Sequence, residues 1–300
     1  MRIAITGASS FIGRHLLDKC IRDGIEAVAI VRENSEIKLN TQKLTNVTVI
    51  KCDMDDYSVL ADKVDFVDCL IYLTWNGTRG ADRNNIVLQR QNFEVGLDTI
   101  KKFVDKGCKT IILAGSQAEY GLCVGKHKVV ETAVSNPNTE YGKYKLKLYE
   151  EVKKYITGKN VRLIEPRFFS LYGTDDYDGT MVISTLKKML RDEPCDLTQC
   201  IQTWDFLHID DAVEGLLKLI KSETAEGIYN FGSGEAYELK HFIEIMYRLT
   251  NSKSKLNYGA IPYPETGMVN VNPCIEKLRG VGWEPKVGFE EGIKSIVTEF

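Results

Sequence analysis

Short apolar runs alternate with longer amphipathic stretches through the first half of this sequence. The apolar runs at 2–6, 26–31, 46–51, 68–73 and 109–113 are rich in aliphatic and β-branched residues, as strands buried on both faces are. Helices are predicted at about 11–23, 56–62, 82–106 and 140–155, and a sixth strand at 161–166. This alternation predicts a parallel sheet whose strands are joined by right-handed crossovers.

From residue 167 onward the pattern is less regular. It predicts helices at about 180–191, 210–221 and 238–249 and after Gly288, with short strands at 205–209 and 228–231. Neither a repeat nor a low-complexity linker interrupts the chain. We therefore expect an α/β protein with two parts. A Rossmann-type doubly wound parallel sheet would take 1–166 and about 203–232, and a smaller C-terminal α/β lobe about 167–202 and 233–300.

The junction between the first strand and the first helix has the composition of a dinucleotide-binding turn. Its sequence is Gly7-Ala8-Ser9-Ser10-Phe11-Ile12-Gly13. Gly7 permits a tight turn, the small residues after it leave room for a pyrophosphate, and Gly13 lets the helix pack closely. The first amides of the helix would face the phosphates. A glycine turn alone is weak evidence, but this one opens an α/β pattern, which favours a dinucleotide site.

Composition and charge exclude several classes of protein. The 300-residue chain is 43% hydrophobic and 27% charged with a net charge of −3, so no basic field favours nucleic acid. No apolar run is long enough to cross a membrane, and Met1 leads straight into a strand instead of a signal peptide, so we expect a cytoplasmic protein. The eight cysteines and four histidines form no CxxC or HExxH pattern. We expect reduced, structural cysteines and no metal site.

The end of the second strand bears on the choice of cofactor. A carboxylate there binds the adenosine ribose of NAD, whereas an arginine pairs with the 2′-phosphate of NADP. This strand ends Val31-Arg32-Glu33, which favours NADP through Arg32. Two alternatives remain open. Arg32 could be only a solvated charge at the end of the strand, and Glu33 beside it could bind the ribose of NAD. Asp53, after the third strand, is a candidate partner for the adenine amino group.

The stretch Tyr141-Gly142-Lys143-Tyr144-Lys145 carries the candidate chemistry. Tyr141 and Lys145 are four residues apart, so on a helix they share one face. The ordinary phenol pKa of about 10 is too high for acid–base work near neutrality, and a nearby ammonium would lower it. Such a pair can exchange a proton with an oxygen whose carbon exchanges hydride with a nicotinamide. Ser116, directly after the fifth strand, would polarise the same oxygen.

Together these motifs resemble the extended short-chain dehydrogenase/reductase family, in the branch that acts on nucleotide sugars. The likeness covers nearly the whole chain, in family order. It is carried by Gly7-x-x-Ser10-x-x-Gly13, Ser116-Gln117-Ala118-Glu119-Tyr120-Gly121, Tyr141-x-x-x-Lys145, Asn92 in QNFEVG, Arg167 in PRFFSLYG, WDFLHIDDAVEGL from Trp204, YNFGSG from Tyr229 and GWEPKVGFEEGI near the C-terminus. Each motif is common alone, but the combination is specific.

The resemblance implies a role for each matched residue. Tyr141 would be the acid/base, Lys145 would orient the nicotinamide ribose and lower the tyrosine pKa, and Ser116 would bond the sugar oxygen. Further cofactor contacts would come from Gly7, Ser9, Ser10, Phe11, Ile12, Gly13, Met54, Leu73, Thr74, Asn92 and Arg167, and substrate contacts from Trp75, Gln117, Phe169 and Trp204. The smaller lobe would bind the nucleotide sugar. Family members usually form homodimers through two long helices, here 82–106 and 140–155.

Departures from the family pattern bear on the reaction. Ser10 replaces a glycine but is small, and Trp204 replaces an arginine, either as a core residue or as a surface on which a base stacks. Gln117 and Ala118 stand where dehydratases carry Asp-Glu, which disfavours dehydration. Arg32 and a likeness to reductases of the abequose-synthase type favour NADPH-dependent reduction of the C4 ketone of a 4-keto-6-deoxy nucleotide sugar. An NAD-dependent nucleotide-sugar 4-epimerase and a non-catalytic NADP-sensing protein are the alternatives.

Overall fold

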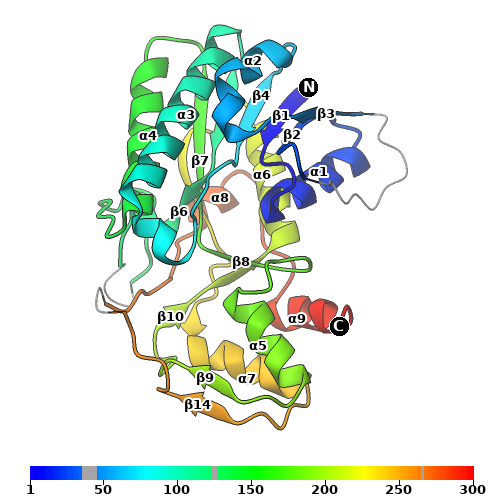
Figure 1. Ribbon diagram of the computed structural model, residues 1–300, viewed down its shortest axis with the longest axis vertical. Helices are drawn as coiled ribbons and strands as arrows, with labels where there is room; N and C mark the ends of the chain where they lie inside the picture. The colour runs from blue at the N-terminus through cyan, green and yellow to red at the C-terminus, as the bar shows by residue number, and fades with distance from the viewer. Residues whose placement is uncertain (36–45, 123–126, 265–266) are drawn as a thin grey trace. The chain divides into compact units, whose positions relative to one another are not determined.

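The computed structural model describes residues 1–35, 46–122, 127–264 and 267–300, which divide into two compact units (Figure 1). Unit 1 is Met1–Gly121, Val134–Arg167 and Leu216–Tyr229, and unit 2 is Leu122–Ala133, Phe168–Gly215 and Asn230–Phe300. The predicted boundaries differ, because they place 122–133 and 203–215 with the first part. These segments bond within unit 2, where the Val129 amide donates to the Asn272 carbonyl and β11 (Phe206–His208) pairs with β8 (Ser170–Tyr172).

Unit 1 is built on the predicted parallel sheet. Its strands are β1 (Arg2–Thr6), β2 (Glu26–Val31), β3 (Val47–Lys51), β4 (Cys69–Tyr72), β5 (Thr110–Leu113), β6 (Gly115–Ser116), β7 (Arg162–Phe168) and β12 (Gly227–Phe231). They lie in the order β12-β7-β5-β4-β1-β2-β3, with β6 beside β7. The order runs outward from β1 in both directions, so the carboxyl ends of β1 and β4 border the crevice where open α/β sheets bind ligands. The predicted Rossmann-type fold is confirmed.

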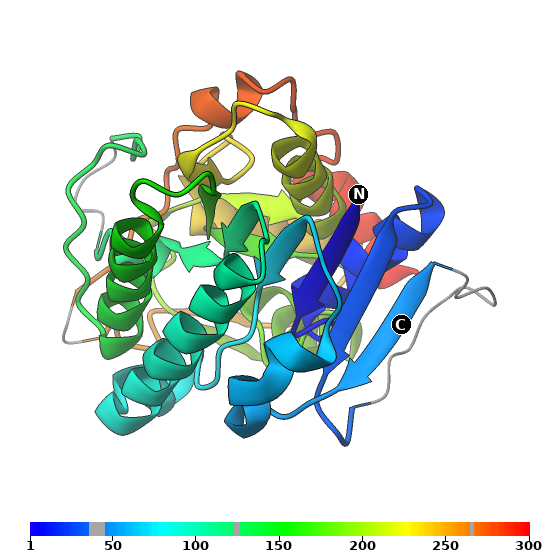
Figure 2. The same ribbon diagram turned by 90° about the horizontal axis from the view of Figure 1, so that it is seen from above.

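Helices cover both faces of this sheet (Figure 2), with α1 (Phe11–Arg22) on one face and α3 (Ile86–Asp105) and α4 (Glu140–Ile156) on the other. The predicted helix 82–106 is two elements, a 3-10 segment η2 (Gly80–Asn84) and then α3. The break occurs because the side chain of Asn85 caps α3 by accepting a hydrogen bond from the Leu88 amide at 3.2 Å. The predicted helix 56–62 is likewise η1 (Met54–Val59) followed by α2 (Leu60–Lys63).

Unit 2 contains small sheets and short helices. Its paired strands are β8 with β11, β10 (Thr203–Trp204) with β13 (Tyr237–Glu238), and β9 (Cys195–Leu197) with β14 (Leu256–Tyr258). Its helices are α5 (Met181–Leu190), α7 (Leu239–Leu249), α8 (Glu276–Arg279) and α9 (Phe289–Val297), and α6 (Ile209–Lys221) begins in it. In its core the rings of Phe206, Phe242 and Phe289 pack together, with ring centroids no more than 5.1 Å apart. Strands of two or three residues show no hydrophobic period, so most of them escape prediction.

The cysteines of the described residues are free, and all of them except Cys274 are buried. Cys123 lies outside those residues. Burial raises the pKa of Cys20 to about 12, so this thiol stays protonated at neutral pH. Within the described ranges, no group of three or more His, Cys, Asp or Glu residues could hold a metal ion. The same part of the chain has no helix long and apolar enough to span a membrane.

Candidate active site

The turn between β1 and α1 is closed by backbone contacts. Gly7 has a φ of 67°, in the left-handed region that favours glycine. A Cβ built on Gly13 would overlap the carbonyl oxygen of Gly7 and the Cα of Ala8, so glycine alone fits where the helix meets the turn. The predicted close packing at Gly13 is confirmed.

Ser10 stabilises the start of α1. Its Oγ accepts a hydrogen bond from the Gly13 amide at 3.2 Å, and its own amide donates to the Gly7 carbonyl at 2.9 Å. Ser10 is therefore the helix N-cap, which explains how a serine is accommodated in this turn. The amides of Phe11 and Ile12 lie at the same helix end and have no acceptor inside the helix. A phosphate bound at this end would find those donors.

Thr6 ties the turn to the end of β4. Its Oγ1 accepts hydrogen bonds from the amides of Leu73 at 3.1 Å and Thr74 at 3.3 Å. The Oγ1 of Thr74 pairs with the hydroxyl of Tyr57 at 2.9 Å. A Cβ on Gly7 would lie 3.4 Å from the amide nitrogen of Thr74. The structure thus brings the predicted cofactor residues of β1 and β4 together.

The predicted adenosine end is open to solvent. Arg32 and Glu33 are both exposed at the end of β2. Oδ1 of Asp53 accepts a hydrogen bond from the Glu33 amide at 3.2 Å, which fixes the end of β2 to the segment after β3. Met54 is buried, and its Sδ lies 3.4 Å from the side-chain nitrogen of Asn76. With both charges exposed, this geometry admits NADP through Arg32 and NAD through Glu33.

The side chain of Asn92, a predicted cofactor contact, bonds the loop after β4. It is 0% exposed, its Oδ1 accepts from the Asn76 amide, and its Nδ2 donates to the Asn76 carbonyl, each at 2.9 Å. Its side chain is occupied in holding the loop after β4. Gln89, one turn earlier on α3, holds the same loop, because its Nε2 donates to the Gly77 carbonyl at 2.9 Å and its Oε1 accepts from the Trp75 indole at 2.7 Å.

Ser116 and Tyr141 come together because α4 packs closely on η3 (Gln117–Glu119). A Cβ built on Gly142 would overlap the carbonyl oxygen of Ala118, so no side chain separates the two elements. The side chain of Ser116 lies near the phenol of Tyr141 and acts to lower the pKa of Tyr141, and Oγ of Ser116 accepts a hydrogen bond from the Ala118 amide at 3.2 Å. Tyr141 is 8% exposed, so its ring is removed from bulk solvent.

The structure corrects the predicted source of acidity at Tyr141. Burial raises the pKa of Tyr141 above its ordinary value, opposed by the hydrogen bond to Ser116 and the positive charge of Arg83. Lys145 is not among the groups that shift this pKa; its Nζ lies 5.9 Å from the centre of the Tyr141 ring and donates to the Ala114 carbonyl at 2.7 Å. Burial also lowers the pKa of Lys145 to about 8. The predicted lowering of the tyrosine pKa by Lys145 is therefore wrong.

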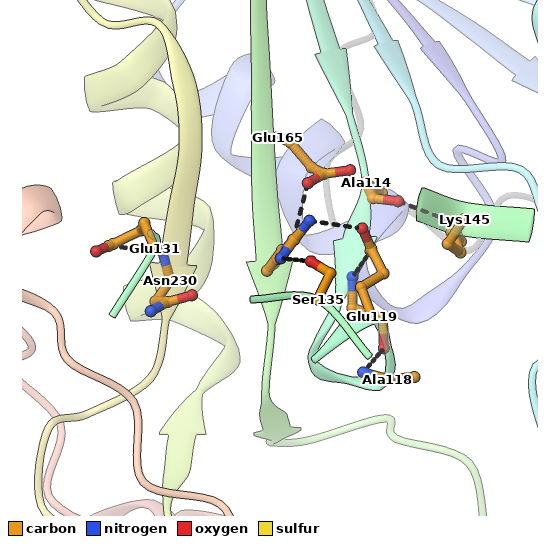
Figure 3. Close-up of polar contacts among 10 residues, drawn as sticks. Ala114, Ala118, Glu119, Glu131, Ser135, Lys145, Glu165 and Asn230 are labelled. Carbon is orange, nitrogen blue, oxygen red and sulfur yellow. Dashed lines mark hydrogen bonds and ion pairs between the residues drawn. The ribbon is translucent and has the colours of Figure 1, made fainter. Parts of the chain in front are cut away.

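Arg167, Glu119 and Glu165 form a buried cluster of charges, in which Glu119 and Glu165 are labelled in Figure 3. Nη2 of Arg167 lies 3.1 Å from Oε2 of Glu119, and its Nε donates to Oε2 of Glu165 at 2.8 Å. Oε1 of Glu119 accepts from the Ser116 amide at 2.7 Å. Burial raises the pKa of both carboxyl groups, while the guanidinium between them acts to lower it. The negative charge of this pair also favours the charged form of Lys145.

Arg167, a predicted cofactor contact, has several protein partners in this cluster. It is 1% exposed, and its Nη1 donates to Oγ of Ser135 at 3.2 Å. Its guanidinium carbon lies 4.4 Å from the centre of the Tyr120 ring.

The predicted substrate residues fall in both units. In unit 1, Trp75 presents its ring edge-on to Tyr141, with centroids 6.1 Å apart, and Gln117 has a buried Oε1 for which the described residues supply no hydrogen-bond partner. In unit 2, Phe169 is buried and Trp204 is half-buried against the core. The indole nitrogen of Trp204 is buried, and the described part of the chain provides it no acceptor.

Other motif residues hold unit 2 together. The carboxylate of Asp205 accepts from the amide and hydroxyl of Ser233 at 2.8 and 3.0 Å and from the Gly234 amide at 2.8 Å. Burial raises the pKa of Asp205 to about 6. The Asn230 amide donates to Glu131 at 3.1 Å (Figure 3). These contacts show that the WDFLHIDD and YNFGSG motifs build a scaffold.

Arg83, in η2, is a site residue that sequence reasoning missed. Its guanidinium carbon lies 4.5 Å from the centre of the Tyr141 ring. The loop around it is polar and contains glycines, so an arginine there resembles a solvated charge. The available signal was its place in the loop that follows the fourth strand, at the ligand-binding edge of the sheet.

Known proteins resemble this chain along nearly its whole length. The profile of the NAD dependent epimerase/dehydratase family matches residues 3–232. CDP-abequose synthase of Salmonella muenchen is 25% identical over 300 residues, covering 99% of this chain and 97% of that protein. The structure of UDP-glucose 4-epimerase from Thermotoga maritima with UDP-glucose has a TM-score of 0.89 at 21% identity, covering 99% and 98% of the two chains. That of dTDP-glucose 4,6-dehydratase from Streptomyces venezuelae with NAD has a TM-score of 0.88 at 18% identity, covering 99% and 96%.

Proposed function

This chain belongs to the NAD dependent epimerase/dehydratase family, and we propose that it reduces the C4 ketone of a 4-keto-6-deoxy nucleotide sugar with NADPH. The observation that carries this proposal is the buried Tyr141, whose phenol interacts with the half-buried Ser116 at the carboxyl edge of the sheet. In this proposal unit 1 binds the dinucleotide and unit 2 the nucleotide sugar. The roles of the residues that bind the cofactor and the sugar are part of this proposal.

The residues of unit 1 suit a dinucleotide. The absence of a side chain at Gly13 keeps the first amides of α1 close to the turn, where they would bind the pyrophosphate. The exposed guanidinium of Arg32 would pair with a 2′-phosphate, and Asp53 would accept a hydrogen bond from the adenine. Leu73 and Thr74 would line the same crevice. The cofactor, when bound, supplies the hydride that reduces the sugar carbon.

The chain's own contribution to the reaction is proton transfer and positioning. Tyr141 would donate its proton to the ketone oxygen as the carbon gains hydride, so that the ketone becomes an alcohol and the phenol becomes a phenolate. Ser116 would donate a hydrogen bond to the same oxygen. Lys145, anchored at the Ala114 carbonyl, would hold the nicotinamide ribose. The phenolate would then recover a proton from solvent before the next turnover.

Two features support reduction over the related reactions. Gln117 and Ala118 provide neither the acid nor the base that elimination of water needs, which argues against a dehydratase. Arg32 favours NADP, which a reductase consumes, over the tightly held NAD of an epimerase. The full-length likeness to CDP-abequose synthase adds weight to the same side.

The test is to assay purified protein for bound nicotinamide and for NADPH consumption with a 4-keto-6-deoxy nucleotide sugar. We expect stoichiometric oxidation of NADPH and no nicotinamide retained through purification. Retained NAD, with interconversion of nucleotide hexoses and no net consumption, would replace this proposal with a 4-epimerase. Binding of NADP without turnover of any nucleotide sugar would support a sensor. Thermal shifts with CDP, GDP, dTDP and UDP would identify the base.

We also propose that the protein is a homodimer through α3 and α4. The exposed positions of α3 carry ion pairs, such as Arg90 with Glu94 at 2.7 Å, but Ile86 and Val87 at its start are 57% and 78% exposed. Burying these two side chains in a dimer would remove apolar surface from water. Sedimentation should show a dimer that Val87→Asp weakens, and a monomer at micromolar concentration would refute the proposal.

A further inference from the structure

The segment that carries Arg83 is fixed against the start of α4. Oδ1 of Asn84 accepts a hydrogen bond from the Glu140 amide at 3.2 Å. Gln89 holds the other side of the segment, because its Nε2 donates to the Asp82 carbonyl at 2.8 Å. Arg83 itself donates from Nη1 to the Thr78 carbonyl at 3.0 Å. The loop therefore presents the guanidinium at a defined place next to Tyr141.

Charged groups reach Tyr141 from three elements. Arg83 comes from η2, with its guanidinium carbon 4.5 Å from the ring centre. Glu119 comes from η3 and disfavours a negative charge on the phenol. Lys145 comes from α4 itself, but its Nζ is 5.9 Å from the ring centre and is directed to the Ala114 carbonyl. Arg83 is therefore the cation nearest the ring among these groups.

We propose that Arg83 is a positioning residue for the proton transfer: it packs on the Tyr141 ring and balances the negative charge that forms there when the phenol gives up its proton. This inference rests on the proposed function of Tyr141 as the acid. A phenolate spreads its charge into the ring, so a cation beside the ring stabilises the phenolate more than the neutral phenol. Lys145 is left to bind the nicotinamide ribose.

The two cations differ in how they respond to pH. Burial lowers the pKa of Lys145 to about 8, so above that pH its charge is largely lost. Burial also lowers the pKa of Arg83 from its ordinary value, but a guanidinium remains charged through the neutral and mildly alkaline range. Arg83 thus keeps a positive charge beside Tyr141 at pH values where Lys145 has become neutral.

The test compares Arg83→Met, Arg83→Lys and Arg90→Met. Arg90 is an exposed arginine on the neighbouring helix, paired with Glu94, and serves as the matched control. Loss of an opposite charge this close should raise the pKa of Tyr141 by about one unit. In ketone reduction a weaker acid is a slower donor, so we expect kcat in Arg83→Met to fall about tenfold. The pH at which activity falls because the phenol ionises should also move to a higher value. Arg83→Lys should restore part of both effects, and Arg90→Met should show neither.

The ionisation of Tyr141 can be measured without any sugar substrate. The alkaline absorbance titration of each protein, minus that of the same protein carrying Tyr141→Phe, isolates this one phenol. A higher pKa in Arg83→Met supports the proposal even if the protein proves to be an epimerase or a sensor. An unchanged titration in folded Arg83→Met would overturn it. If Arg83→Met does not fold, Arg83→Lys decides, because an ammonium at a different place should still shift the titration of Tyr141. An unshifted titration in Arg83→Lys would contradict the role of Arg83.

Discussion

At the β1–α1 turn the decisive contacts are made by backbone atoms, whereas around Tyr141 they are made by side chains. Gly7 and Gly13 contribute through the side chains they lack. Around the phenol, Arg83 comes from η2, Ser116 and Glu119 come from the segment after β5, and each of the three changes the pKa of Tyr141. The turn is therefore a property of a short stretch of sequence, and the chemical end is a property of the tertiary fold.

This difference predicts that the two regions fail in different ways. A substitution at the turn should alter how tightly the dinucleotide binds, because the phosphate site consists of amides brought close by small residues. A substitution around Tyr141 should alter proton transfer, or the stability of a buried charge cluster, and leave cofactor affinity largely unchanged. Substitutions in the two regions test this separation.

Tyr141→Phe should have the largest effect. It removes the proton donor, so kcat should fall about 10²- to 10⁴-fold, the usual contribution of a general acid. The dissociation constant for NADPH, measured by fluorescence titration, should stay unchanged because the turn is untouched. Full activity in this variant would contradict the assignment of the acid, and a large loss of cofactor affinity would show that the two regions are not separate.

Arg167→Met should damage stability more than chemistry. It leaves Glu119 and Glu165 buried without their guanidinium, a loss expected to lower the free energy of unfolding by about 3–5 kcal/mol. Urea unfolding would measure this, with the exposed Arg191→Met as the control, expected to change stability by less than about 0.5 kcal/mol. Adding Glu119→Gln and Glu165→Gln should restore part of the loss. Equal stability of the two arginine variants would mean that the positive charge of Arg167 does not stabilise the buried carboxylates.

The same contrast explains how far sequence reasoning could reach. The Gly7 turn, the parallel strands and the long helices follow from local patterns, and the structure confirms them. The neighbours of Tyr141 do not follow, because YxxxK states a spacing along one helix and says nothing of η2 or β7. Arg83 and Glu165 thus resembled ordinary surface charges.

Two motif residues have protein partners that the sequence did not predict, for a related reason. Asn92 and Arg167 sit in family motifs, and the resemblance made both of them cofactor contacts. Each is buried and contacts protein groups, Asn92 the backbone of Asn76 and Arg167 two carboxylates. A motif match identifies a constrained position, but whether a ligand or the fold imposes the constraint depends on burial.

Gly13→Ala tests the turn. The added methyl group would collide with the Gly7 carbonyl, so α1 must move away from β1. We expect a stability loss of about 1–3 kcal/mol and weaker NADPH binding, with kcat at saturating cofactor largely retained. Gly288→Ala, where a Cβ would meet nothing within 4 Å, is the control in thermal unfolding. A lowered kcat at saturation in Gly13→Ala would couple the turn to the chemistry and weaken the comparison.

Arg32→Gln should have the smallest effect on stability and catalysis. Its effect should be selective, on the affinity for NADPH and not on that for NADH. Arg32 is exposed, so its loss should change stability by less than about 0.5 kcal/mol. If it pairs with the 2′-phosphate, NADPH affinity should fall about tenfold, and less at high salt, while NADH affinity stays the same. Glu33→Gln is the matched control, since its loss should weaken only NADH. The two cofactors differ only at the 2′ position of the adenosine ribose, which this proposal places at the exposed end of β2. Tighter binding of NADH than of NADPH by the unaltered protein, with no response to Arg32→Gln, would therefore assign the ribose to Glu33 and favour the epimerase.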